Sequence, residues 1–235
     1  MPRVCVYIDG FNLYHGAKEL VKVQNPGSSW KWLDLVALSR RICPEDEIKA
    51  VKYYTAQVST PDTDPNLGQR QQTYLRALAT APLVSIHYGQ FMLQKKRMPL
   101  VSRPTGLKKL ILQFLGMDLK THPDGNVTVT VWRMEEKGTD VNLGVHLVAD
   151  AFQDRFDKAI VISNDTDLCE PVRLVVSELG RKVIVVNPRG HKQPASALRK
   201  VATEARKIRV TALLESQFPD QIEDHWGTIT RPANW

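Results

Sequence analysis

Four aspartates in three separate segments have the residue type and the positions for phosphate chemistry. They are Asp9, Asp140, Asp165 and Asp167. If the fold brings them into one crevice, two carboxylates about 4 Å apart repel each other by about 4 kcal/mol at an effective dielectric of 20. A hard divalent cation with oxygen ligands relieves that repulsion, and phosphate esters are the usual substrates of such sites.

The first of these aspartates opens the run Asp9-Gly10-Phe11-Asn12, directly after the apolar residues 4–8. One interpretation places the Asp9 carboxylate on a metal ion, with the Asn12 amide beside it to orient groups or contact phosphate. The alternative is structural, with Asn12 as the N-cap of a helix and Asp9 as a turn residue.

A pair of aspartates follows a second apolar run in Ser163-Asn164-Asp165-Thr166-Asp167. Alternate residues of an extended segment point the same way, so both carboxylates can face one ion. In the structural alternative, Asp167 caps a helix and Glu170 completes a capping box. Pro171 favours position N1 and moves the expected helix start to about Glu170, which leaves Asp167 in the loop.

Asp140 stands at the start of an amphipathic stretch, in Lys137-Gly138-Thr139-Asp140. Thr139 as the N-cap and Asp140 in the first turn, stabilised by the helix dipole, account for this segment without chemistry. The same geometry projects the Asp140 carboxylate toward the edge of the sheet. Lys137 is a candidate for holding a phosphate oxygen, with a solvated lysine as the alternative.

The elements that must position these residues alternate along the chain. Short apolar runs predict strands at 4–8, 49–57, 83–88, 159–163 and 182–187. Helical periodicity predicts helices at 33–42, 66–80, 141–152 and 171–179. This alternation is typical of α/β proteins with a parallel sheet, whose sites form at the carboxyl ends of the strands.

Two stretches are rich in basic residues. The first lies in residues 89–136, where a predicted strand at 128–132 and a turn indicate a β-rich insertion with a basic rim. The second follows the last predicted strand. We expect nucleic-acid contacts from both stretches, with a solvated surface as the alternative. The candidates are Lys95, Lys96, Arg97, Arg189 and Lys192.

The composition suits a protein with a full core and a polyanionic partner. The chain has 235 residues, 43% of them hydrophobic, and a net charge of +7. Its three cysteines have no CxxC spacing, which argues against a zinc site. No uncharged apolar run approaches the length of a membrane span, so we expect a cytoplasmic protein without a membrane partner.

Three segments, taken in order, resemble the NYN domain family of PIN-like ribonucleases, and in particular its bacterial LabA-like branch. They are 7–14, 136–143 and 163–168. The resemblance implies a PIN-like Rossmannoid three-layer sandwich with a central, mostly parallel sheet, and an acidic site for Mg²⁺ or Mn²⁺. Asp9, Asp140, Asp165 and Asp167 fall on the family's acidic positions, and Asn12 falls on its amide position.

The resulting hypothesis is a metal-dependent endoribonuclease that cleaves single-stranded RNA. The four aspartates would hold the metal and, with Asn12, form the catalytic set. We expect the nuclease domain at 1–210, interrupted by the insertion at about 89–136, and a C-terminal helix or tail at 211–235. The alternatives are a nucleic-acid-binding regulator with a vestigial site and a DNA or flap-type nuclease. The number of metal ions and the oligomeric state, with a homodimer as one option, stay open.

Overall fold

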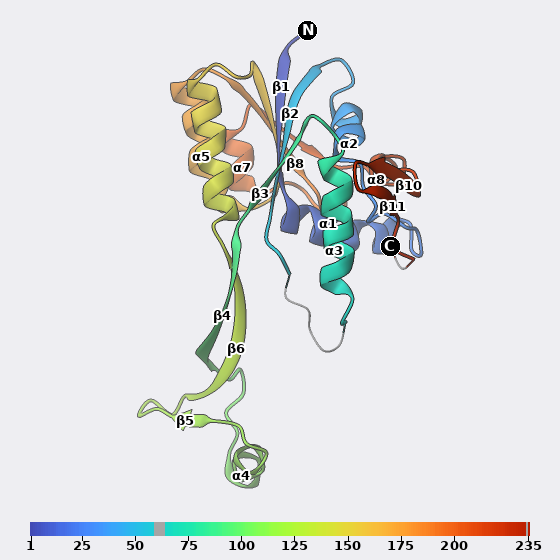
Figure 1. The fold of residues 1–235 in the computed structure, drawn as a ribbon. Helices are drawn as coiled ribbons and strands as arrows, with labels where there is room; N and C mark the ends of the chain where they lie inside the picture. Colours follow the sequence, from blue (N-terminus) through green and yellow to red (C-terminus); the bar gives the residue numbers. More distant parts are fainter. Residues whose placement is uncertain (59–63, 234) are drawn as a thin grey trace. The chain divides into compact units, whose positions relative to one another are not determined.

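The computed structural model describes residues 1–58, 64–233 and 235, except for the side chain of Met134. The chain divides into two compact units (Figure 1). The sheet unit comprises Met1–Gln90 and Gly138–Trp235, and the inserted unit comprises Phe91–Lys137. We describe each unit by itself. In the described part of the chain, no helix is long and apolar enough to cross a membrane.

The sheet unit is built on a six-stranded sheet with the strand order β3-β2-β1-β7-β8-β9. Every neighbouring pair in it is parallel. The strands are β1 (Arg3–Asp9), β2 (Glu47–Thr55), β3 (Val84–Tyr88), β7 (Lys158–Ile162), β8 (Lys182–Asn187) and β9 (Glu204–Lys207). This arrangement confirms the α/β fold with a mostly parallel sheet, whereas β9 has no counterpart among the predicted strands.

Helices cover both faces of the sheet and create two hydrophobic cores. One face carries α1 (Gly10–Gln24), α2 (Leu35–Ile42), α3 (Leu67–Ala79) and α8 (Val210–Leu214). The other carries α5 (Thr139–Phe152), α6 (Cys169–Arg173) and α7 (Ser196–Val201). β1 serves both cores, because Val6 and Ile8 pack on the first and Tyr7 packs on the second.

The inserted unit contains a small sheet with the order β4-β6-β5 and one helix. Its elements are β4 (Gln90–Pro99), α4 (Gly106–Phe114), β5 (Leu119–Thr121) and β6 (Val127–Lys137). The predicted β-rich character is therefore present, and α4 is an addition to it. Among the residues of this unit whose burial is described, Val127 alone is buried. Backbone pairing and surface contacts must therefore hold the unit together.

The C-terminal segment is more regular than the predicted helix or tail. After α8, the strands β10 (Gln221–Asp224) and β11 (Gly227–Thr230) form an antiparallel hairpin. The last residue, Trp235, packs its ring 5.3 Å from the ring of Tyr74 and 6.2 Å from that of Trp32. These contacts join Trp235 to the first core, and no periodicity in the sequence predicts them.

Candidate active site

The Asp9 carboxylate ends β1 and caps α1. Its Oδ1 accepts a hydrogen bond from the backbone N–H of Asn12 at 2.9 Å, and its Oδ2 accepts one from Asn12 Nδ2 at 2.7 Å. The helix cap is therefore Asp9, which corrects the alternative that gave this role to Asn12. The Asn12 side chain instead donates a hydrogen bond to the carboxylate and holds it in place.

Gly10 is required at this junction because the backbone of the neighbouring strand passes very close. A Cβ atom at this position would lie 2.6 Å from the carbonyl oxygen of Tyr54 and 2.8 Å from the hydroxyl of Tyr53. Only glycine allows α1 to begin directly against β2. The Asp-Gly pair thus fixes the direction in which the Asp9 carboxylate leaves the strand.

Hydrogen bonds join the carboxyl ends of β1 and β7. The Ser163 hydroxyl donates to Asp9 Oδ2 at 2.9 Å, and the backbone N–H of Asp165 donates to Ser163 Oγ at 3.1 Å. The Asn164 N–H donates to Asn12 Oδ1 at 3.3 Å. Two distant segments of the sequence therefore meet at one edge of the sheet, as the parallel topology predicts.

The Asp9 carboxylate is only 3% exposed, so it is almost removed from water. Burial raises its pKa, and repulsion from the Asp165 carboxylate adds to the rise. The hydrogen bonds from Asn12 and Ser163 act in the opposite direction. The charged form of Asp9 is thus held in a costly environment beside a second acid, which is the electrostatic situation that a bound cation relieves.

The loop after β7 tightens into a short 3₁₀ helix, η1 (Thr166–Leu168), before α6 begins at Cys169. Asp165 Oδ1 accepts from the Asp167 N–H at 3.0 Å, so Asp165 is the cap here. The expectation that Asp167 stays in the loop is wrong, since Asp167 lies in η1. The helix α6 begins at Cys169, one residue before the expected start at about Glu170, and Pro171 takes the third helical position instead of the first. A proline is tolerated there, since the first-turn N–H groups have no partner within the helix.

The carboxylates of Asp165 and Asp167 both act electrostatically on the thiol of Cys169. Burial raises the pKa of Cys169, and the charges of Asp165 and Asp167 raise it further. Asp165 is partly buried and Asp167 is exposed. The pair therefore faces the solvent side of the carboxyl edge, whereas Asp9 lies beneath it.

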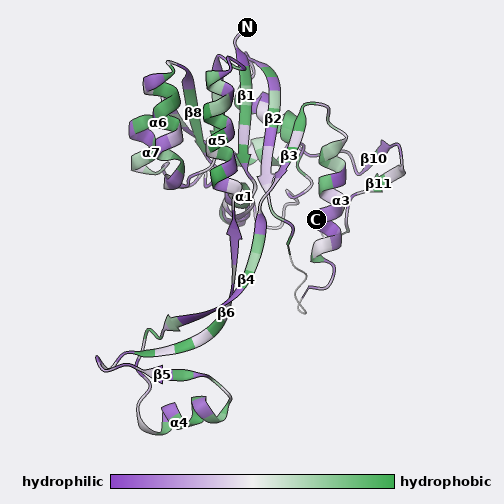
Figure 2. Ribbon diagram, turned by 60° about the vertical axis from the view of Figure 1, so that its left-hand side comes forward, coloured by the Kyte–Doolittle hydropathy of each residue, from purple (hydrophilic) through white to green (hydrophobic). Residues whose placement is uncertain are grey.

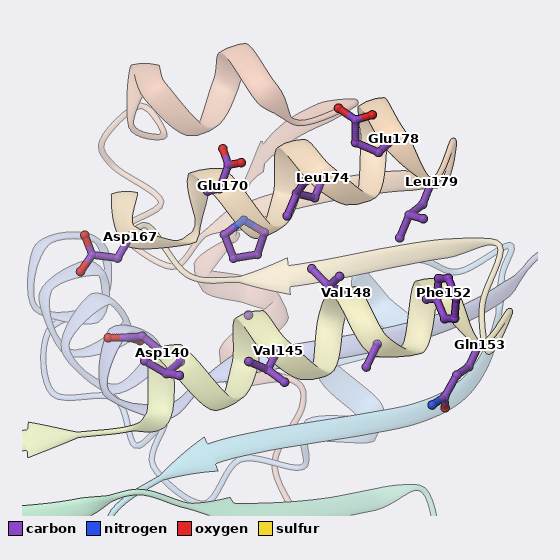
Figure 3. Close-up of a pocket in the computed structure, with 14 residues that line it drawn as sticks. Asp140, Val145, Val148, Phe152, Gln153, Asp167, Glu170, Leu174, Glu178 and Leu179 are labelled. Atoms are coloured by element: carbon purple, nitrogen blue, oxygen red, sulfur yellow. The ribbon is translucent and has the colours of Figure 1, made fainter.

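Asp140 lies in the first turn of α5, as expected. The residue that caps this helix is Gly138, with a φ of 96°, and not Thr139, which is buried at the first helical position. Asp140 and Asp167 both line one groove between α5 and α6, and Figure 3 shows both side chains at the same end of it. The structure thus forms two acidic pairs, with Asp9 near Asp165 and Asp140 across the groove mouth from Asp167.

The donor chemistry fits a hard divalent ion, because every candidate ligand is a carboxylate or amide oxygen. Within the described residues, no three His, Cys, Asp or Glu side chains converge closely enough to hold a metal ion. Asp9 and Asp165 would hold such an ion from beneath, with Asp140 and Asp167 supplying further oxygen atoms from the groove side. This assignment of ligands stays a prediction.

The basic residues predicted in the inserted unit all have partners within that unit. Lys96 and Lys137 form ion pairs with Glu135 at 3.3 and 3.0 Å, and Arg97 pairs with Asp118 at 2.5 Å. Lys95 Nζ lies 4.9 Å from the ring centre of Trp132, a cation–π distance. Trp132 itself is 63% exposed, so it presents a flat aromatic surface beside a cation.

The two basic candidates in the sheet unit share one acid. Arg189 and Lys192 lie in the loop after β8, and Glu19 of α1 pairs with them at 3.4 and 2.8 Å. His191 approaches the same carboxylate at 3.1 Å. Glu19 therefore holds the loop at the carboxyl edge and offsets part of its charge.

Sequence reasoning missed three residues that shape these surfaces. Ser163 connects the two acidic strand ends, Trp132 supplies an exposed ring, and Glu19 positions the loop after β8. A polar residue at the end of an apolar strand was the available signal for Ser163. Trp132 and Glu19 carry no such signal, because their roles depend on neighbours distant in the sequence.

Comparison with known proteins supports the family expected from the motifs. Residues 102–209 match the NYN domain. The match includes the segments of Asp140, Asp165 and Asp167, and Asp9 lies outside it. An NYN domain implies a nuclease-type function and a nucleic-acid substrate.

The chain is also 27% identical over 256 aligned positions to 6-hydroxy-3-succinoylpyridine 3-monooxygenase HspA of Pseudomonas putida (strain DSM 28022 / S16). That similarity covers 99% of this chain and 75% of the relative. Among solved structures, the protein of unknown function VPA0982 from Vibrio parahaemolyticus has a TM-score of 0.48 and 18% identity, covering 88% of this chain and 93% of that one. A sirtuin structure has a TM-score of 0.36 and 12% identity, with 91% and 94% covered. Structural likenesses this weak carry no argument about function.

The domain match and the acidic motifs at the carboxyl edge of the sheet agree: residues 102–209, somewhat under half of the chain, match the NYN domain and support the family expected from the sequence.

Proposed function

We propose that this protein is a metal-dependent endoribonuclease that hydrolyses phosphodiester bonds of single-stranded RNA. The observation that carries the proposal is the hydrogen-bonded junction of Asp9, Ser163 and Asp165 at adjacent ends of β1 and β7. A buried carboxylate, Asp9, lies there beside a partly exposed one, Asp165, in the segment that matches an NYN domain, and burial and mutual repulsion favour a cation. A bound Mg²⁺ or Mn²⁺ would supply charge neutralisation at phosphate and an activated water.

The chain's own residues supply the positioning. Asn12 and Ser163 fix the Asp9 carboxylate through three hydrogen bonds, so it cannot turn away from the edge of the sheet. The Asp165 side chain is fixed by the Asp167 N–H. Asp140 approaches from the start of α5, on the other side of the groove mouth. Such preorganised carboxylates align the reacting groups without reorganisation during the reaction.

The inserted unit is suited to holding the RNA strand. Trp132 and Lys95 combine an exposed ring with a cation, and base stacking on such rings tolerates any sequence. Ion pairs join Lys96 and Lys137 to Glu135, and Arg97 to Asp118. Because exposed ion pairs are weak, phosphate groups can compete with these carboxylates for the cations. Arg189 and Lys192 would contact the backbone near the carboxyl edge.

The test is digestion of end-labelled single-stranded RNA, structured RNA and single-stranded DNA with Mg²⁺, with Mn²⁺ and with a chelator. The informative variant is Asp167→Asn, because this side chain is exposed and its amide analogue keeps the shape. We expect cleavage to fall at least about 100-fold, as is typical when a group that stabilises the transition state is lost. Glu45→Gln, an exposed acid in the turn before β2 at the opposite edge of the sheet, is the matched control. Full activity in Asp167→Asn would remove this residue from the site, and chelator-resistant cleavage would end the metal-dependent proposal.

The relative from Pseudomonas putida supports a second candidate, an aromatic monooxygenase, because its similarity spans 99% of this chain. Such a reaction places one atom of O₂ on the ring and reduces the other to water with two electrons from a reductant. The assay is oxygen uptake with 6-hydroxy-3-succinoylpyridine and a reduced nicotinamide. Uptake that depends on this substrate, without RNA cleavage under any metal condition, would favour the monooxygenase.

A further inference from the structure

The groove between α5 and α6 presents an unusual apolar surface. It measures about 770 Å³ and is lined by one face of α5, which carries Val141, Val145, Val148 and Phe152. Of these, Val141 is 68% exposed and Phe152 79% exposed. Gly144 lies between the two helices, where a Cβ atom would come within 2.8 Å of Pro171 Cγ, so the helices pack closely beneath the groove. Exposed apolar surfaces of this kind mark interaction sites.

The rim of this groove is acidic, although the chain as a whole is basic. Four carboxylates line it, those of Asp140, Asp167, Glu170 and Glu178 (Figure 3). Arg173 pairs with Glu170 at 2.8 Å and with Glu178 at 3.0 Å. The groove therefore favours an occupant with an apolar face and basic flanks.

Helix α4 of the inserted unit has the complementary character. No residue of this helix is buried. Leu107, Leu110, Ile111 and Phe114 recur at helical spacing on one face, and Phe114 is 91% exposed. The ribbon of α4 in Figure 2 carries both hydrophobic and hydrophilic residues. Lys108 and Lys109 lie in the same helix, and residues 106–117 contain no acid. An amphipathic helix with an unpartnered apolar face is suited to a hydrophobic groove.

We propose that two copies of this chain associate by placing α4 of one copy in the α5–α6 groove of the other. The lengths agree: the nine residues of α4 span about 13 Å, and the α5 face from Val141 to Phe152 spans about 16 Å. Because one chain carries both surfaces, a twofold exchange covers two helices and two grooves at once. The lysines of α4 then face the acidic rim. The association does not require nuclease activity, although the groove rim includes Asp140 and Asp167, which are also candidate metal ligands.

The experiment measures the mass of the full-length chain by analytical ultracentrifugation, up to about 100 μM and at two salt concentrations. We expect a dimer, with twice the 26.6 kDa of one chain. Leu110→Glu combined with Phe114→Glu places charges on the α4 face, and Val145→Glu places one in the groove. Each change should raise the dissociation constant at least about 100-fold, because central apolar contacts dominate an interface. Val23→Glu, at an exposed apolar position of α1, should leave the dissociation constant unchanged.

Mixing the two monomeric variants separates this contact from any other. The α4 variant keeps an intact groove and the groove variant keeps an intact α4, so the mixture regains one of the two contacts and should form a 1:1 complex. Circular dichroism and the thermal midpoint check that each variant is folded. A wild-type chain that is monomeric up to about 100 μM overturns the proposal. So do variants that still dimerise, and so does a mixture of folded variants that stays monomeric.

Discussion

The sheet unit and the inserted unit of this protein differ in how their side chains are buried. In the sheet unit, both faces of a parallel sheet are covered and two cores are formed by fully buried side chains such as Tyr7, Leu147 and Ile160. In the inserted unit, Val127 alone is buried among the residues whose burial is described, and large apolar side chains stay exposed.

This difference indicates that the two units have different roles. Fixed carboxylates need a rigid frame, and the cores of the sheet unit provide it at the ends of β1 and β7. The inserted unit relies on its strand pairing and on exposed ion pairs, each worth about 0–1 kcal/mol. Its exposed apolar and basic side chains are better explained as contact surfaces than as sources of stability.

The most direct test of this difference is to truncate one leucine side chain to alanine in each unit. Leu147→Ala removes a fully buried side chain from the second core and should lower the free energy of unfolding by about 2–5 kcal/mol. Leu93→Ala in β4 removes a side chain that is 58% exposed and should change it by less than about 0.5 kcal/mol. Urea unfolding of both variants gives the answer. Equal losses would show that the inserted unit has a core of its own.

A second comparison separates the buried from the exposed aspartate of the site. Asp9→Asn turns one acceptor oxygen into a donor opposite the donors of Asn12 and Ser163, so it should cost about 1–3 kcal/mol of stability as well as activity. Asp167→Asn should cost activity alone. Thermal melts beside cleavage assays measure both quantities. An Asp9→Asn protein as stable as the parent would contradict the hydrogen-bond assignment.

A single substitution at Trp132 tests the proposed binding role of the inserted unit. Trp132→Ala should weaken single-stranded RNA binding by about 1–3 kcal/mol, the contribution of one stacked base, and leave the thermal midpoint unchanged. Trp226→Ala is the control, since Trp226 is also an exposed ring near a cation, Arg76, but lies in the C-terminal hairpin. Fluorescence anisotropy with labelled RNA would show the difference. Similar losses in both variants would argue against a specific stacking site.

The smallest expected effect concerns two neighbouring histidines, His146 of α5 and His87 of β3. Tyr54 hydroxyl and His146 Nδ1 lie 2.9 Å apart, and the His87 ring stacks on Tyr54. Burial lowers the pKa of both histidines below 6.5, and for His87 the charge of His146 lowers it further. The unfolded chain therefore binds more protons than the folded one just below pH 6.5, so stability should fall as the pH drops from about 7 toward 5.

Unfolding free energies measured across that pH range test this expectation. Replacing both His87 and His146 with Gln should flatten the fall, whereas His15→Gln, at an exposed position of α1, should not. An unchanged slope in the double variant would show that other groups cause the pH dependence.

Much of this fold was predictable, because buried parallel strands and amphipathic helices leave plain periodic signals. Residues 182–187 were predicted as a strand and form β8 with the same bounds. Helix starts were less predictable. Pro171 and Thr139 have local preferences for particular positions, but packing placed each elsewhere, Pro171 against Gly144 and Thr139 at the buried first position of α5. The strand β9 was missed because Glu204–Lys207 is a charged segment at the edge of the sheet.

The sequence by itself determined the α/β class, and it supplied the NYN resemblance and the acidic candidates, because these depend on local patterns and on motif order. Only the tertiary structure decided how the acids are grouped. Ser163 and Asn12 draw Asp9 and Asp165 together, and the packing of α5 on α6 sets Asp140 opposite Asp167. Asp9 and Ser163 are 154 positions apart and Asp140 and Asp167 are 27 apart, and at such separations no local pattern exists to reveal the contacts.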